Sequence, residues 1–444
     1  MSDPAVFTGR AAVRAGILVT GTEVLSGLVT DRNGPWLSER LADLGVDVAM
    51  IQVVGDRPED LAAALAHMRA EGLALIITSG GLGPTADDLT AEVVGAFCGR
   101  KMVLDAALEG RIFEIIKPLR SRWPEARLEE LRDANRKQAV VPAGATVLEP
   151  RGTAPGLIVT PAAGRSGPTV VVLPGPPGEL MGMWPEATAT GAFRDAVAGA
   201  TVYRKATMRL YGVPEASISH TLRDAAASGL ALERLEITTC LRRGELEITA
   251  RFEPPAQDEY AALATFVARV HGSHLFSPDG ATIDEQVARL LVEGGETIAL
   301  AESCTGGLLA ARLTERPGAS AYVRGGAVVY DNAVKSAVLG VDTALISRHG
   351  AVSVEVARAL ADGARARFGA SVGVGITGIA GPGGGSAEKP VGLVCFSVTS
   401  GGFEVAERAQ TLERTLPGDR AAVRDRATTV AMHLIASLLR GEES

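Results

Sequence analysis

The sequence repeats one local pattern: a short apolar run ends in glycine and hydroxyl residues, and an amphipathic helix follows. Residues 73–78 form a continuous apolar run, which is typical of a strand buried on both faces of a parallel sheet. Residues 15–20 and 46–53 predict two further strands, and helices are predicted over 33–44 and 58–70, where apolar residues recur at helical spacing. Strands that alternate with helices in this way predict a parallel, doubly wound α/β sheet.

Composition limits the class of protein. The chain has 444 residues, of which 46% are hydrophobic, enough for two or three domains with cores. The formal net charge is −8, which argues against direct binding of nucleic acid, because such binding needs clustered Lys and Arg. The four cysteines have no CxxC spacing, which argues against a disulfide framework or a zinc site. With no signal-peptide pattern and no apolar run of membrane length, we expect a cytoplasmic protein with no membrane contact.

Changes in pattern divide the chain into three predicted domains. Residues 14–185 carry the doubly wound pattern, and residues 281–442 carry a second α/β pattern. Between them, residues 186–276 predict a small α+β unit with the order strand–helix–strand–strand–helix. This middle unit has no GxxG clamp for RNA, so we expect it to connect domains or form a homodimer. Two histidines at its end, His271 and His274, are interpreted as surface residues rather than metal ligands.

The first α/β region has a glycine-rich loop, residues 79–90, directly after the strand at 73–78. Open α/β sheets bind ligands beyond the carboxyl ends of their strands, and the glycines of this loop allow a phosphate to approach the backbone. Asp87 and Asp88 are candidates to hold a divalent cation that bridges the phosphate. The alternative is a glycine turn in which Asp88 caps the next helix. Residues 173–179 form a second loop of the same type.

The second α/β region contains the stretch 297–307, where a predicted strand at 298–301 breaks at Glu302 and Ser303 before a helix. Backbone N–H groups at a helix start favour a phosphate or a developing oxyanion. Ser303, Cys304 and Thr305 lie where a nucleophile would need to be. The alternative is an ordinary strand-to-helix turn in which Ser303 is the N-cap.

Two more strand ends in this region carry polar or glycine-rich loops. The predicted strand 325–330 is followed by Lys335, and the strand 373–377 is followed by glycines through residue 385. We expect these loops and the stretch 297–307 to share one cleft, with a helix over 420–439 covering the sheet.

Four stretches of the first region, residues 21–23, 79–90, 152–156 and 173–179, resemble the N-terminal domain of the CinA family (competence/damage-inducible protein A). That domain is similar to the molybdopterin-binding fold of MoaB and MogA proteins. The resemblance implies a pyrophosphatase that hydrolyses ADP-ribose with a divalent cation, Mg²⁺ or Co²⁺. It makes Asp87, Asp88 and Glu23 the candidate metal residues. The implied phosphate site comprises glycines and one threonine: Gly80, Gly81, Gly83, Thr90 and Gly175.

The motifs of the second region are similar to the CinA C-terminal domain, whose single-domain relatives, the PncC proteins, deamidate nicotinamide mononucleotide. The resemblance implies that Ser303 is the nucleophile, that Tyr330 and Lys335 form the base system, and that no metal is needed. It also implies a set of substrate-binding residues: Glu302, Cys304, Thr305, Gly306, Asn332, Thr377, Gly378, Gly381, Gly383 and Lys389.

The chemistry agrees with this assignment but leaves choices open. Serine needs a base, no histidine lies in these motifs, and Lys335 can serve if its surroundings depress its pKa. Whether Lys335 or Tyr330 takes the proton stays open, and Cys304 is a rival nucleophile. Two other functions also remain: a non-catalytic N-terminal module that binds a pterin or nucleotide, and an interaction protein of the competence or DNA-repair machinery.

Overall fold

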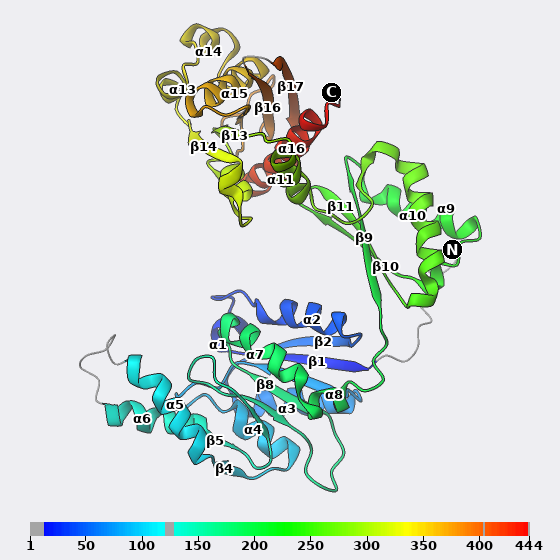
Figure 1. The fold of residues 1–444 in the computed structure, drawn as a ribbon, viewed down its shortest axis with the longest axis vertical. Helices are drawn as coiled ribbons and strands as arrows, with labels where there is room; N and C mark the ends of the chain where they lie inside the picture. Colours follow the sequence, from blue (N-terminus) through cyan, green and yellow to red (C-terminus); the bar gives the residue numbers. More distant parts are fainter. Residues whose placement is uncertain (1–12, 120–127, 403–404, 443–444) are drawn as a thin grey trace. The chain divides into compact units, whose positions relative to one another are not determined.

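The computed structural model describes residues 13–119, 128–402 and 405–442. The chain divides into two compact units (Figure 1). The first comprises Met1–Arg204 and Arg251–Gln257, and the second comprises Lys205–Ala250 and Asp258–Ser444. Among the described residues, no helix is both long and apolar enough to cross a membrane.

The first unit is built on a six-stranded sheet in the order β2-β1-β3-β8-β7-β6. Its strands are β1 (Arg14–Thr20), β2 (Asp47–Val54), β3 (Leu75–Ser79), β6 (Thr146–Leu148), β7 (Gly156–Val159) and β8 (Thr169–Leu173). The first four strands of that order are parallel, as predicted, but β7 and β6 are antiparallel to their neighbours. The prediction of a wholly parallel sheet is therefore wrong at this edge. Only residues 160–168 separate β7 from β8, too few for a crossover helix.

Helices cover both faces of this sheet. One face packs against α2 (Asn33–Asp43), α7 (Pro177–Ala189) and α8 (Gly191–Ala196), and the other against α3 (Pro58–Ala70), α4 (Thr90–Cys98) and α5 (Ala106–Leu119). Strand β3 is buried along its whole length, with Ile77 in one apolar cluster and Ile76 in the other. The sequence prediction of a strand covered on both faces is thus confirmed. Smaller elements complete the unit: α1 (Thr22–Leu25), β4 (Met102–Leu104), α6 (Leu128–Arg136) and β5 (Val140–Pro142).

The predicted division at residue 185 falls inside α7, which continues to Ala189. The middle region then forms β9 (Arg204–Tyr211), α9 (Glu215–Ala227), β10 (Glu236–Arg242), β11 (Glu245–Phe252), α10 (Gln257–His271) and β12 (Leu275–Ser277). The four strands form one sheet in the order β10-β11-β9-β12, so β12 adds a strand that the sequence did not predict. His271 bonds the Thr221 hydroxyl at 2.9 Å, and His274 bonds the Tyr211 carbonyl at 2.9 Å, so both histidines have local structural partners.

The C-terminal part of the second unit has a five-stranded sheet in the order β14-β13-β15-β16-β17. Its strands are β13 (Ile298–Glu302), β14 (Val323–Val328), β15 (Val372–Gly378), β16 (Leu393–Gly402) and β17 (Val405–Thr415). The first three strands of that order are parallel and the last two antiparallel. One face packs on α11 (Ile283–Glu293), α12 (Leu308–Thr314) and α16 (Arg420–Arg440). The other packs on α13 (Asn332–Leu339), α14 (Thr343–His349) and α15 (Val354–Phe368).

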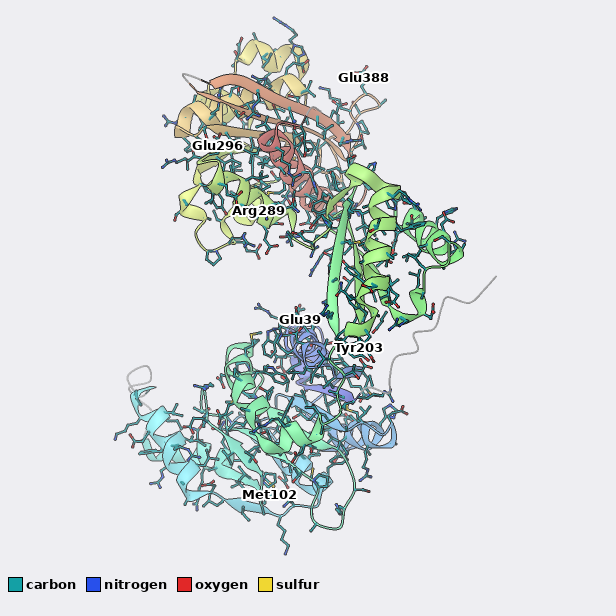
Figure 2. The ribbon with its side chains drawn as sticks, turned by 45° about the vertical axis from the view of Figure 1, so that its right-hand side comes forward. Glu39, Met102, Tyr203, Arg289, Glu296 and Glu388 are labelled. Carbon is teal, nitrogen blue, oxygen red and sulfur yellow. The ribbon has the colours of Figure 1, made fainter. Side chains whose placement is uncertain are left out.

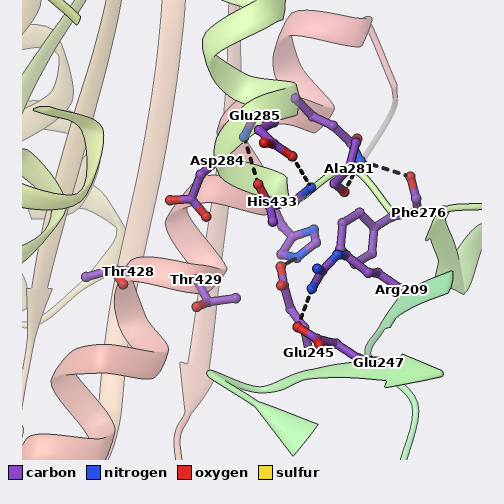
Figure 3. Close-up of polar contacts among 12 residues, drawn as sticks. Arg209, Glu245, Glu247, Phe276, Ala281, Asp284, Glu285, Thr428, Thr429 and His433 are labelled. Atoms are coloured by element: carbon purple, nitrogen blue, oxygen red, sulfur yellow. Dashed lines mark hydrogen bonds and ion pairs between the residues drawn. The ribbon is translucent and has the colours of Figure 1, made fainter. Parts of the chain in front are cut away.

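A polar junction joins the middle sheet to α16 within the second unit (Figure 3). His433 of α16 bonds the Glu245 carboxylate at 2.7 Å and stacks on Tyr211, with ring centroids 3.7 Å apart. Burial lowers the pKa of His433, and the Glu245 carboxylate opposes that shift. Arg209 and Glu247 form an ion pair beside this stack. These contacts explain why the middle region and the C-terminal sheet form one compact unit.

Candidate functional site

Two candidate sites lie at the carboxyl ends of the parallel strands, one in each unit. In the first unit, a cavity of about 320 Å³ opens beyond β1, β3 and β8. Most predicted N-terminal site residues line it, including Gly80, Gly81, Gly83 and Gly175. Among the described residues, its lining has no Lys or Arg. It has five carboxylates: Glu23, Asp56, Asp87, Asp88 and Glu179.

Close backbone packing explains two of the loop glycines. Gly80 has a φ of 108°, and a Cβ there would lie 2.4 Å from the Thr20 carbonyl oxygen. The N–H of Gly80 donates to the Leu173 carbonyl at 3.0 Å, so it is not free to bind phosphate as predicted. A Cβ on Gly81 would lie 2.1 Å from the Thr90 hydroxyl. Thr90 itself is 2% exposed and supports the loop from behind, which corrects its predicted role as a phosphate ligand.

The two loop aspartates share one hydroxyl group. Thr85 Oγ1 lies 2.5 Å from a carboxylate oxygen of Asp87 and 2.5 Å from one of Asp88. This hydroxyl lowers the pKa of Asp87. Asp88 also accepts the N–H of Thr85, so it does not cap α4, whose N-cap residue is Leu89. Within the described ranges, Glu23 does not join these aspartates in a metal-binding group of three, so the predicted three-carboxylate set is not assembled.

Two buried amides missed by the sequence analysis tie the loops of this cavity together. Asn33 Nδ2 donates to the Ser79 hydroxyl at 2.8 Å and to the Gly175 carbonyl at 2.7 Å. Gln138 Nε2 donates to the Leu82 carbonyl at 2.8 Å and lies 3.3 Å from the Thr153 hydroxyl. Neither residue belongs to a glycine-rich stretch, so only the folded arrangement reveals its role.

Two further cavities adjoin the acidic one. A cavity of about 250 Å³ shares Gly81 and Asp88 with it and continues to Met102 of β4, which is labelled in Figure 2. On the other side, a cavity of about 440 Å³ shares Glu23 and Gly175 and continues to Val24. The polar centre is therefore flanked by two spaces with apolar walls.

In the second unit, β13 lies between β14 and β15 and brings three predicted site residues together. The Ser303 N–H donates to the Ile376 carbonyl of β15 at 2.9 Å. On the other side, the Val329 N–H donates to the Glu302 carbonyl at 2.8 Å. Ser303 and Thr377 therefore follow directly on paired strand residues, and Tyr330 lies two residues beyond Val328, the β14 partner of Glu302.

Glu302 fills the helix start that was predicted to bind an anion. Its carboxylate is 2% exposed and accepts the N–H groups of Gly307 (3.0 Å), Leu309 (3.1 Å) and Ala310 (2.8 Å). The helix α12 begins only at Leu308, and its first-turn donors are already satisfied. The start of α12 is therefore occupied by Glu302, which supports the turn before the helix rather than facing a ligand.

Arg424 of α16 fixes that turn. Its Nε donates to the Cys304 carbonyl at 3.1 Å, and its Nη2 donates to the Thr305 carbonyl at 2.8 Å. Because a trans peptide directs C=O and N–H to opposite sides, the Thr305 N–H points away from Arg424. Gly306, with a φ of 62°, lets the guanidinium approach, since a Cβ there would lie 3.2 Å from Nη2.

Cys304 is a packing residue in this arrangement. It is 4% exposed and belongs to the apolar cluster under α16. Burial raises the pKa of its thiol to about 11, although the backbone N–H groups of Cys304 and Thr305 oppose the shift. Gly378 makes room for the sulfur, because a Cβ there would lie 3.0 Å from Sγ. A thiol with this pKa is a poor nucleophile at neutral pH.

Lys335 is almost wholly buried, with 1% of its surface exposed. Its Nζ donates to the Tyr330 backbone carbonyl at 3.0 Å, rather than to the Tyr330 hydroxyl. Burial lowers the pKa of this amine, while Asp331 and Cys304 oppose the shift through their charges. Asp331 caps α13 through the Ala333 N–H, and Asn332 at the start of that helix is exposed.

Tyr330 is 57% exposed, and its hydroxyl accepts a hydrogen bond from Arg420 Nη2 at 2.7 Å. Arg420 Nη1 also donates to the Gly381 carbonyl at 2.7 Å, so this arginine connects two loops of the site. The sequence analysis predicted that α16 covers the sheet but missed Arg420 and Arg424. Their spacing of four residues at the start of the helix was the available signal.

Two residues that were predicted to bind a ligand instead donate hydrogen bonds to backbone carbonyls. The Thr377 side chain is 1% exposed, and its hydroxyl donates to the Ala351 carbonyl at 2.8 Å. Lys389 Nζ donates to the carbonyls of His349 (2.7 Å) and Val352 (2.6 Å). The predicted role of Lys389 as the phosphate cation is therefore weakened. Its neighbour Glu388 lies on the same loop, at the outer edge of the domain in Figure 2, and Gly383 in the preceding turn has open space around it.

Comparison with known proteins gives a consistent result for both units. The family model described as the probable molybdopterin binding domain matches residues 16–190, and the model described as the CinA C-terminal domain matches residues 280–439. A CinA-like protein of Mycolicibacterium vanbaalenii is 56% identical over 430 residues, covering 97% of this chain and 99% of that protein. A CinA-like protein of Mycobacterium tuberculosis is 54% identical over 435 residues, covering 97% and 98%.

Among solved structures, a CinA superfamily protein from Klebsiella pneumoniae is 32% identical, covering 36% of this chain and 96% of that one, with a TM-score of 0.34. The molybdopterin biosynthesis enzyme MoaB from a Thermus species is 20% identical, covering 42% and 96%, with a TM-score of 0.28. The family assignment depends on the long, full-length relatives. With more than half of its residues identical to theirs over nearly its whole length, the chain belongs to the CinA family.

Proposed function

We propose that the C-terminal site deamidates nicotinamide mononucleotide to nicotinic acid mononucleotide and ammonia. The observation that carries this proposal is a fully buried lysine beside a serine turn. Burial favours the neutral amine of Lys335, the form that can accept a proton, and this amine interacts electrostatically with Cys304, the neighbour of Ser303. A serine and a basic amine are sufficient for acyl transfer without a histidine.

In this mechanism the Ser303 oxygen attacks the carboxamide carbon, and its proton passes to Lys335. The N–H groups of Cys304 and Thr305 stabilise the oxyanion, and Arg424 holds the 304–305 peptide, which carries the second of these N–H groups, by donating to the Cys304 carbonyl. As the C–N bond breaks, Lys335 returns the proton to the leaving nitrogen, and ammonia departs. Water then cleaves the acyl ester: Lys335 accepts the proton of the water and passes it to the departing Ser303 oxygen, and the acid product is released. The Tyr330 hydroxyl accepts a hydrogen bond from Arg420 and can donate its own hydrogen to the substrate.

Ammonia release from nicotinamide mononucleotide by the full chain tests this proposal. We expect Ser303→Ala to abolish release, because the acyl-enzyme cannot form. Cys304→Ala is the matched control, since it removes the neighbouring nucleophile from the same turn, and we expect it to keep most of the activity. The opposite result, activity in Ser303→Ala and none in Cys304→Ala, would assign the attack to the thiol.

We also propose that the N-terminal site hydrolyses ADP-ribose at its pyrophosphate with the help of a divalent cation. The observation that carries this is the shape and charge of the cavity. A polar centre lies between two spaces with apolar walls, which suits a pyrophosphate that has a ring-bearing group at each end. Five carboxylates line this cavity and one lysine, Lys137, lines the adjoining one, so a bound cation would offset the remaining repulsion between the carboxylates and the pyrophosphate.

The donor set fits Mg²⁺ or a similar hard cation, because it consists of carboxylate oxygens. Asp87 and Asp88, already joined through Thr85, are the residues that would hold it. The bound cation would supply charge neutralisation and polarise the phosphoryl oxygens. The chain itself positions the substrate: Gly81 and Gly83 allow the phosphates close to the backbone, while Asn33 and Gln138 hold the surrounding loops rigid.

Formation of AMP from ADP-ribose with Mg²⁺ or Co²⁺ tests this second proposal. We expect Asp88→Asn to reduce AMP formation at least 100-fold, and Glu59→Gln, an exposed change on α3, to leave it unchanged. If ADP-ribose or a pterin binds the full chain but no AMP appears with either cation, the domain is a binding module instead.

A further inference from the structure

A further cavity of the first unit lies at the opposite end of the sheet from the acidic one. Its volume is about 340 Å³, and it is lined by the ends of α3 and α4 and by the turn that precedes β8. The acidic cavity lies beyond the last residue of β8, whereas this one lies before its first. Five strand residues separate the two, or roughly 16 Å.

Two arginines supply all of the formal charge in its lining. Arg69 comes from the end of α3 and Arg165 from the turn, and no carboxylate lines the cavity with them. Within the described parts of the chain, neither guanidinium has an ion pair or a side-chain hydrogen bond, although Arg69 stacks on Phe97 at 5.2 Å. Burial raises the pKa of the nearby Cys98 thiol to about 11, so at neutral pH this thiol carries no negative charge that could pair with the arginines. Two like charges in one concavity repel until an anion binds between them.

The walls of this cavity are fixed. Arg100 donates to the Thr160 carbonyl at 3.0 Å and to the Pro161 carbonyl at 3.1 Å, which anchors the start of the turn. The Ala162 N–H donates to the Cys98 carbonyl at 2.9 Å, which joins the turn to the end of α4. Gly99, with a φ of 71°, lets Arg165 lie against it, because a Cβ there would approach the guanidinium to 2.7 Å.

Stacking on Phe97 occupies one face of the Arg69 guanidinium and leaves the N–H groups along its edge available. Arginine edges bind phosphate through paired, charge-assisted hydrogen bonds. Ser166 and the glycine-containing turn add small polar groups to the same wall. The cavity thus has the charge, the donors and the rigidity of a phosphate site, without the carboxylates that surround the candidate catalytic cavity.

We propose that the Arg69/Arg165 cavity is a second anion site, which binds the dianionic phosphate group of a small phosphorylated metabolite without a metal. The proposal is independent of the activities proposed above, because it uses none of their residues.

Calorimetric titration of the full chain with inorganic phosphate, and separately with ribose 5-phosphate, tests it. EDTA in the buffer prevents cation-assisted binding at the acidic cavity. We expect Arg69→Gln and Arg165→Gln each to weaken binding at least tenfold, and the double variant to lose it. Arg57→Gln is the matched control, since Arg57 precedes the same helix α3 at its other end.

Affinity should also fall as salt rises, because the attraction is between exposed charges. Equal binding of both ligands means that only the phosphate group is recognised, and tighter binding of ribose 5-phosphate means that the cavity also contacts the sugar; both support the site. Unchanged affinity in a double variant with a wild-type thermal melt would overturn the proposal. So would the absence of binding of either ligand to the wild type up to roughly 10 mM.

Discussion

The two candidate sites occupy the same topological position and use it in opposite ways. In the N-terminal cavity five carboxylates line one open space, and Asp87 and Asp88 among them accept hydrogen bonds from Thr85. In the C-terminal site the charges are engaged by the protein itself: Glu302 by helix N–H groups, and Arg420 and Arg424 by backbone carbonyls. The position of a site between a strand end and a helix start therefore does not determine its chemistry. The side chains at that position determine whether the reaction needs a metal ion.

Removal of divalent cations is expected to have the largest effect, and it tests whether only the N-terminal site depends on a cation. We expect EDTA to reduce AMP formation from ADP-ribose at least 1,000-fold, because the acidic cavity cannot then hold a pyrophosphate. Ammonia release from nicotinamide mononucleotide should stay within twofold, since its proposed groups are a hydroxyl and an amine. Both activities are measured on the same sample, and added Mg²⁺ should restore the first. Loss of both activities would show that the C-terminal site also depends on a cation.

The second test concerns Lys335, the buried group on which the C-terminal proposal depends. We expect Lys335→Met to lower kcat for deamidation about 100-fold or more, as expected when a general base is lost. In the wild type, kcat/KM should fall as the pH drops through the folded pKa of Lys335, because protonation removes the base. Lys205→Met, a change of an exposed lysine in the same unit, should do neither.

The pH dependence of folding stability is an independent test of the lowered pKa of Lys335. Burial depresses the pKa of Lys335 in the folded state, so between that pKa and the unfolded value the unfolded chain binds more protons. The wild type should therefore gain stability as the pH rises through this window, and Lys335→Met should lack that gain. Denaturant unfolding across pH measures the difference. Parallel curves for the two proteins would mean that the lysine is not desolvated.

A third, smaller effect is expected from Glu302→Gln. The carboxylate accepts three N–H groups at the positive end of α12, and an amide offers only one neutral acceptor oxygen. Loss of the charge should cost about 2 kcal/mol of unfolding free energy in the second unit, from charge-assisted bonds and the helix dipole. Glu315→Gln, at the exposed end of the same helix, is the control and should change little. An unchanged stability in Glu302→Gln would show that the charge of Glu302 does not stabilise this helix end.

Much of the fold was predictable because its signals are local. The burial of β3 on both faces follows from its apolar run, and the start of α3 follows from Pro58. The antiparallel edge was not predictable in this way. Residues 156–173 look like any pair of short strands, and their direction depends on the length of the connection between them.

In the candidate sites, too, the residues within local motifs were predictable and their distant partners were not. Ser303, Asp87 and Asp88 stand in motifs, so the sequence identifies them as candidates. The partners that these motifs acquire on folding come from far along the chain: Arg424 lies more than 100 residues from the carbonyls that it holds, and Asn33 more than 100 from the Gly175 carbonyl. The four-residue spacing of Arg420 and Arg424 places them on one helix face but does not say which backbone carbonyls they contact. The same holds for Lys389, whose amine was expected to face a ligand but binds backbone carbonyls.

Arg424→Met is expected to have the smallest of these effects and tests the idea that the C-terminal site is organised from within. Methionine keeps much of the packing of the arginine stem but removes both hydrogen bonds to the 304–305 turn. If those bonds only orient the oxyanion donors, kcat should fall about tenfold while KM and the pH profile stay unchanged. Arg426→Met is the control for the loss of a positive charge on this helix. Arg426 lies two residues further along α16, and its guanidinium lies near Gly244. A rise in KM with an unchanged kcat would instead mean that Arg424 contacts the substrate, and the C-terminal site would then present charge to its ligand, as the N-terminal cavity does.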